Sequence, residues 1–196
     1  MFQLRTLFVL SVIATAQNAT ALPVQPHEVV NDVIQRVMSK VNGLDGSADE
    51  DGRILLEVFE TEISPHLDFD TITRWLAGER WLSFTDEERE ELTAIVRGHI
   101  IGAYAALLAQ GPTVAIEVEP SSLIRTRSAK VGALMATREG KVFHIEFRLI
   151  RSEASWKLYD LAVEGLSFAR SLRAELAPVI NAGGVDGLKT YLDTHR

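Results

Sequence analysis

The side chains that could perform acid–base or metal chemistry are five histidines and a scattered set of carboxylates, and the chain contains no cysteine. His66, Asp68 and Asp70 follow Pro65 and place three potential metal ligands close together. No two histidines have the spacing of a zinc site, and the H-E-x-x-H sequence is absent. We therefore interpret the segment as a loop followed by a helix that Asp68 caps, and we expect no metal site.

Two residues are candidates for a general base. His99 lies on the apolar stripe of a predicted long helix, and Asp160 is flanked by apolar residues, as a base in an apolar pocket would be. We favour structural roles for both: a core histidine, and a hydrogen-bonding partner for nearby backbone or for Arg173. The chain has no G-x-S-x-G, P-loop or dinucleotide fingerprint. The sequence therefore predicts neither an enzyme nor a cofactor, although an enzyme using Asp160 or His99 remains an alternative.

Residues 1–21 have the pattern of a secretory signal peptide. Arg5 is the only charge before Glu28, an apolar run extends from Leu7 to Ala14, and a small-x-small site ends at Ala21. A transmembrane helix needs roughly 20 apolar residues, so this run is too short to span a bilayer. We expect cleavage after Ala21, export, no stable membrane insertion, and one mature domain over residues 22–196.

The composition argues against nucleic acid as a partner and excludes disulfides as a source of stability. The net charge of −7 makes nucleic acid a poor partner, because phosphate binding requires a basic surface. With no disulfide available, the mature domain must be held together by its apolar core.

Periodicity predicts an α+β domain in which helices precede a sheet and two further helices close the chain. Helices are expected over residues 26–41, 54–63, 69–77 and 85–110, then about four antiparallel strands over 114–118, 123–137, 143–149 and 156–163, and finally helices over 167–181 and 186–195. Thr85 and Glu88 form a capping box, and Gly183-Gly184 separates the last helices. In the third helix, Trp75 is expected to point inward.

The strand over 156–163 shows apolar residues on both of its expected faces. Strict alternation places Trp156, Leu158 and Ala162 on one face. Tyr159, Leu161 and Val163 then occupy the other face. Gly165 is expected to end the strand, and Ser167 to cap the following helix.

The order of several short motifs resembles that of the MlaC family of exported phospholipid-binding proteins, also called toluene-tolerance or organic-solvent-resistance proteins. Leu67, Leu172 and Leu176 depart from the family pattern, which has aromatic residues at these positions. The resemblance covers about residues 27–194 and is carried by Pro65-His66-Leu67-Asp68-Phe69, Gly78, Trp81, Tyr104, Trp156-Lys157-x-Tyr159-Asp160, Glu164-Gly165-Leu166-Ser167 and Arg173.

The resemblance implies a fold and a function. The fold would be a cystatin- or NTF2-like curved sheet wrapped by helices, with an apolar pocket between them. The function would be to carry a phospholipid, by its two acyl chains, across the periplasm between an outer-membrane lipoprotein–porin complex and an inner-membrane ABC transporter. Such transport maintains the lipid asymmetry of the outer membrane. Alternatives are a carrier of hopanoids or other hydrophobic ligands, and an adaptor of the transporter that carries nothing.

The pocket lining is expected to come from the apolar stripe of the long helix, one face of the sheet and the strand over 156–163. The candidate lipid-binding residues are Ile95, Ile100, Tyr104, Leu108, Val114, Ile116, Val118, Phe143, Ile145, Phe147, Tyr159 and Val163.

Overall fold

The computed structural model describes residues 24–41, 48–108, 113–120, 122–137, 139–152 and 155–195. The expected signal peptide therefore lies outside the described residues. No helix in the described ranges has the length and apolar character needed to cross a bilayer.

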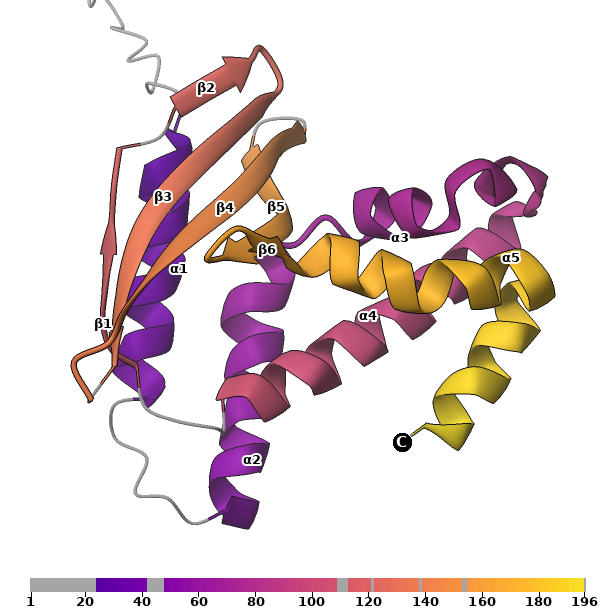
Figure 1. Ribbon diagram of the computed structural model, residues 1–196, viewed down its shortest axis with the longest axis horizontal. Helices are drawn as coiled ribbons and strands as arrows, with labels where there is room; N and C mark the ends of the chain where they lie inside the picture. Colours follow the sequence, from indigo (N-terminus) through magenta and orange to yellow (C-terminus); the bar gives the residue numbers. More distant parts are fainter. Residues whose placement is uncertain are drawn as a thin grey trace, which may run out of the picture.

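Capping residues that the sequence predicted mark the starts of two helices, which begin at Phe69 and Asp86. Asp68 accepts a hydrogen bond from the Thr71 amide at 2.9 Å, and Thr85 and Glu88 form the predicted reciprocal capping box. These caps are confirmed. The helical elements in Figure 1 are α1 (Pro26–Val41), α2 (Ala48–Val58), the π-helical η1 (Phe59–Ile63), the 3₁₀ segments η2 (Ser64–His66) and η3 (Gly78–Ser83), α3 (Phe69–Ala77), α4 (Asp86–Leu108) and α5 (Phe168–Thr194).

The break predicted between the last two helices is a kink inside α5. Gly184 has φ 60° and ψ −144°, which are non-helical angles that favour glycine. The two arms of α5 diverge at this residue, and the second arm turns away from the first in Figure 1.

The antiparallel sheet has six strands instead of the expected four or so: β1 (Thr113–Val118), β2 (Ser122–Arg125), β3 (Ser128–Thr137), β4 (Val142–Ser152), β5 (Ser155–Val163) and β6 (Leu166–Ser167). Their order is β1-β3-β4-β5-β6, with β2 paired to β3. The expected strand over 123–137 is divided between β2 and β3 because the chain turns back on itself between them. Glu164 and Gly165, both at positive φ, form the tight turn that ends β5 as predicted.

A β-bulge at Tyr159 changes which residues of β5 share a face. Arg148 on β4 pairs with Asp160, but the next residue, Leu149, pairs with Leu158, so Tyr159 is the extra residue. Beyond the bulge, Leu161 and Val163 lie on the same face as Leu158 and Trp156, whereas Asp160 and Ala162 lie on the opposite face. The prediction from strict alternation is therefore confirmed for Trp156 and Leu158, which share a face, but it is wrong for Leu161, Ala162 and Val163.

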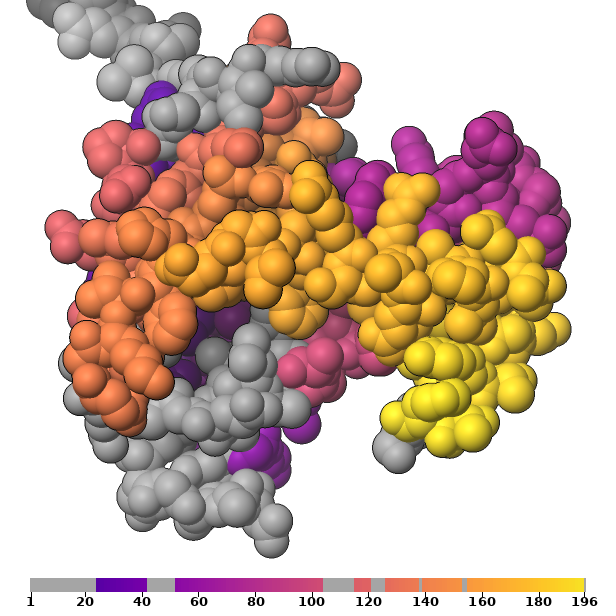
Figure 2. Space-filling view, viewed as in Figure 1, coloured from indigo at the N-terminus to yellow at the C-terminus, as the bar shows by residue number. Residues whose placement is uncertain are grey.

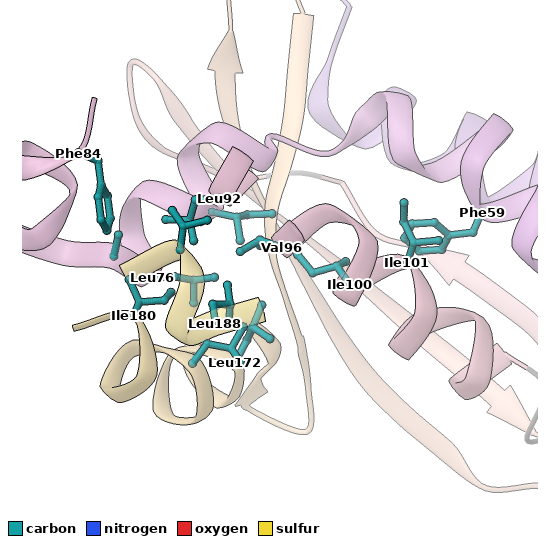
Figure 3. Close-up of a cluster of buried hydrophobic side chains, with 14 residues drawn as sticks. Phe59, Leu76, Phe84, Leu92, Val96, Ile100, Ile101, Leu172, Ile180 and Leu188 are labelled. Atoms are coloured by element: carbon teal, nitrogen blue, oxygen red, sulfur yellow. The ribbon is translucent and has the colours of Figure 1, made fainter. Parts of the chain in front are cut away.

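Two separate apolar cores hold the fold together. In the first, Val30 and Ile34 of α1 pack against Val131, Leu149 and Trp156 on one face of the sheet. The second core lies among α3, α4 and α5 and is shown in Figure 3; its members include Leu76, Leu92, Val96, Leu176, Ile180 and Leu188.

One residue predicted to point into this second core lies instead on the outward face of α3. Trp75 was expected to point inward but is 38% exposed. The Arg173 guanidinium lies 4.6 Å from the centre of its ring, an interaction that needs no burial.

The two cores meet where the chain enters α3. Leu67 forms a parallel bridge with Leu158 of β5, and the Asp68 amide donates to the Leu158 carbonyl at 2.8 Å. Lys157 donates to the Pro65 carbonyl at the same place. These contacts fix the helical layer against the strand that leads to the candidate site.

Candidate functional site

The sheet face that packs against α1 is apolar along much of its length. The register places Phe143, Ile145 and Phe147 of β4 on this face, opposite Met135, Ala133 and Val131 of β3. Their side chains are aligned because directly paired residues of an antiparallel sheet share a face. Six predicted site residues lie together here: Ile116, Val118, Phe143, Ile145, Phe147 and Val163.

Helix α1 covers this face incompletely. Ile145 is only 7% exposed, but Phe143, Phe147 and Val163 are half-buried. Figure 2 shows a hollow beside the orange strands, with indigo and purple atoms of the N-terminal helices visible in its depth. We call this region, between the apolar sheet face and the helices, the cleft.

The C-terminal half of α1 adds apolar residues that the sequence did not nominate for the site. Val37, Met38 and Val41 continue the stripe of the buried Val30 and Ile34, but they are only half-buried. The signal in the sequence was the apolar stripe itself, which continues to Val41, the last residue of the helix.

The remaining predicted site residues do not line the cleft as a group. Ile95 and Ile100 of α4 belong to the helical core or pack against it, and Tyr159 also packs against that core. The side chains of Tyr104, Leu108 and Val114 lie outside the described residues. The predicted set is therefore divided between the sheet face and the helical layer.

The opposite face of the sheet carries charge. Glu146 accepts hydrogen bonds or ion pairs from Lys130 at 3.0 Å and from Arg148 at 2.7 Å, and Arg148 also reaches Asp160 at 2.8 Å. Glu146 therefore bridges Lys130 of β3 and Arg148 of its own strand, and Arg148 in turn bridges to Asp160 on β5. The sheet thus separates an apolar surface from an ionic one.

Asp160 holds the start of α5 and does not contact Arg173, which was the predicted side-chain partner. One carboxylate oxygen accepts from Arg148 and from the Ser167 hydroxyl at 2.7 Å, and the other accepts from the Ala169 amide at 2.9 Å. The predicted contact with nearby backbone is confirmed. Both oxygens are occupied by groups that anchor a helix, an arrangement that suits a structural carboxylate.

Two of the three potential metal ligands within residues 66–70 have structural roles. His66 lies 3.2 Å from the Arg36 guanidinium, and burial, followed by the positive charges of Arg36 and Lys157, lowers the pKa of His66 below its usual value. Asp68 caps α3. Within the described part of the chain, no group of three or more histidine or acidic residues is placed to hold a metal ion.

A second hollow lies between α3, α4 and the ends of β4 and β5, with a volume of about 720 Å³. Its walls carry both signs of charge, including Arg97 and Lys157 beside Asp70 and Glu90. An acyl chain would leave such groups without water, so this hollow suits a lipid tail less well than the cleft does.

Comparison with known proteins places the chain in a family. The model of the family described as MlaC protein matches residues 31–194. The toluene tolerance protein ttg2D of Pseudomonas putida is 19% identical over 166 residues, which cover 84% of this chain and 77% of that protein. The fold is similar to that of a phospholipid-binding protein from Ralstonia solanacearum solved in complex with a phospholipid: the TM-score is 0.75 at 22% identity, over 87% of this chain and 96% of that one. Because the family match spans most of its length, this chain belongs to the MlaC family.

Proposed function

We propose that the mature chain is a periplasmic phospholipid carrier that holds two acyl chains in the cleft. The observation that carries this proposal is the asymmetry of the sheet, whose α1 side presents half-buried apolar residues while the other side presents paired charges. The relative from Ralstonia solanacearum, which has the same fold, was solved with a phospholipid. The half-buried aromatic rings Phe143 and Phe147 would contact the tails directly.

The energetics explain why such a protein would recognise tails. Two acyl chains contain roughly 30 methylenes, each worth about 0.8 kcal/mol on leaving water, so a free lipid would face a barrier of about 24 kcal/mol. A carrier lowers this barrier by offering apolar contact to the tails, while the headgroup remains hydrated at the mouth of the cleft.

The proposed route runs between an outer-membrane lipoprotein–porin complex and an inner-membrane ABC transporter, which would maintain lipid asymmetry of the outer membrane. Family membership supports this route. The net charge of −7 suits docking to basic surfaces on both partners, and the rate of such docking would fall as salt is raised. The energy for directed transport would come from the transporter.

The decisive experiment is lipid extraction and native mass spectrometry of protein purified from its own periplasm, followed by uptake from phosphatidylcholine vesicles. A bound diacyl lipid supports the proposal, and a bound polycyclic lipid favours a hopanoid carrier instead. Protein that is empty in every preparation, takes up no lipid and still binds transporter subunits would be an adaptor, and the carrier proposal would be abandoned.

A further inference from the structure

A small cavity lies between the helical core and β5. Its volume is about 30 Å³, and its lining includes Ile100 of α4, Tyr159 and Leu161 of β5, and Leu172 of α5. A space of this size accommodates one or two water-sized groups, where about 10–15 Å³ is needed for one. The cavity therefore has room for the end of a hydrocarbon chain without any movement of the backbone.

Eight of the ten residues that line the cavity are apolar, and the two polar ones are Tyr159 and Asp160. Asp160 is its one charged member, and both oxygens of that carboxylate are engaged by Arg148, Ser167 and Ala169. A water molecule needs two to four polar partners to be held in a buried site, so an apolar occupant is favoured here.

The walls of the cavity continue those of the cleft. On β5, Leu161 lines the cavity and lies on the same face as Val163 at the cleft, two residues further along the strand. Strand β5 thus leads from the cleft to the cavity.

We propose that this cavity is the inner end of the acyl site and that Leu172 and Ile100 limit the length of the tail that fits. The proposal rests on the proposed lipid-carrying function. Leu172 is 6% exposed and Ile100 is 4% exposed, so neither can swing into solvent to make room. A larger side chain at residue 172 would fill the cavity, and a smaller one at either position would lengthen it.

The test is competition among dimyristoleoyl, dipalmitoleoyl and dioleoyl phosphatidylcholine in mixed vesicles, with the bound species counted by mass spectrometry. We expect Leu172→Phe to shift the bound lipids toward shorter tails, and Leu172→Ala and Ile100→Ala to shift them toward longer tails. Each methylene gained or lost in apolar contact changes the ratio by up to about fourfold. Leu176→Ala is the matched control, because Leu176 is buried in the same core and does not line the cavity.

The outcomes separate the two proposals. Opposite shifts for the enlarged and filled variants, with the wild-type distribution in Leu176→Ala, support the assignment. If Leu172→Phe does not fold, the Ala variants still decide it. Lipid bound with an unchanged tail distribution in every folded variant overturns the assignment and leaves the carrier function intact. Failure of the wild-type protein to bind any of the three lipids overturns both proposals.

Discussion

Replacing Asp160 by alanine should destabilise the fold by about 3 kcal/mol. The side chain is 4% exposed and lies 2.8 Å from the Arg148 guanidinium, and breaking a buried ion pair by removing one partner costs about 3–5 kcal/mol. The lower end of this range applies, since Arg148 keeps Glu146 at 2.7 Å and remains 20% exposed. Loss of the acceptor also leaves the Ala169 amide at the start of α5 without its partner.

Two further substitutions should destabilise the fold by smaller amounts than Asp160→Ala does. Asp160→Asn keeps one neutral acceptor oxygen, which can still accept from the Ala169 amide, but it places an NH2 group where the other oxygen accepted from Ser167 and Arg148. It also removes the charge facing Arg148, so it should cost about 1–2 kcal/mol. Glu146→Gln removes the more exposed partner of Arg148 and should cost about 1 kcal/mol or less. The expected order of destabilisation is therefore Asp160→Ala, Asp160→Asn, Glu146→Gln.

The assay is urea unfolding of lipid-stripped protein, since bound lipid would stabilise the native state by mass action and hide the differences. An Asp160→Ala midpoint equal to that of Glu146→Gln would refute a helix-anchoring role for Asp160. If Asp160→Asn kept full stability but abolished a measurable turnover, the carboxylate would be a catalytic base and the enzyme alternative would regain support.

Three other predictions concern the cleft, the kink and one histidine. Val163→Glu should weaken lipid uptake from vesicles by at least about tenfold, because an apolar site filled by acyl chains cannot solvate a carboxylate. Ala115→Glu is the control: Ala115 is exposed on the opposite face of the sheet, so uptake should be unchanged. Equal losses in the two variants would contradict the assignment of the cleft. Gly184→Ala should lower the free energy of unfolding by about 1–3 kcal/mol, because residue 184 has a positive φ. Gly183→Ala should raise it by about 0.5–1 kcal/mol, because Gly183 is exposed and has open space around it. Similar effects of the two substitutions in urea unfolding would exclude backbone strain as the cause. The pKa of His66 is lowered in the folded state, so the unfolded chain binds a proton at a higher pH than the folded protein does. The stability that neutral His66 contributes is therefore fully present above its unfolded pKa of about 6.5. It is lost as the pH falls through the lower folded pKa. Urea midpoints measured from about pH 8 to about pH 5 should fall less steeply in His66→Gln, and an identical slope would exclude this histidine as the source.

The local elements were determined by the sequence because their interactions span only a few residues. The Asp68 cap and the Thr85–Glu88 capping box each join groups three residues apart, so they depend on residues that are close together in the sequence. The positive-φ turn at Gly165 and the break at Gly184 follow in the same way from the conformational freedom of glycine. Family membership was also visible in the sequence, and the comparison confirmed it.

Only the tertiary structure decided which side of each element faces which neighbour. Alternation assigns strand faces correctly until a bulge adds a residue, and the bulge at Tyr159 depends on pairing with β4, which sequence spacing does not report. The partner of Asp160 proved to be Arg148, twelve residues away on the neighbouring strand, because strand register brings them together. The cavity between Ile100, Tyr159 and Leu172 likewise requires α4, β5 and α5 to meet, and no local pattern specifies the space that three separate elements leave between them.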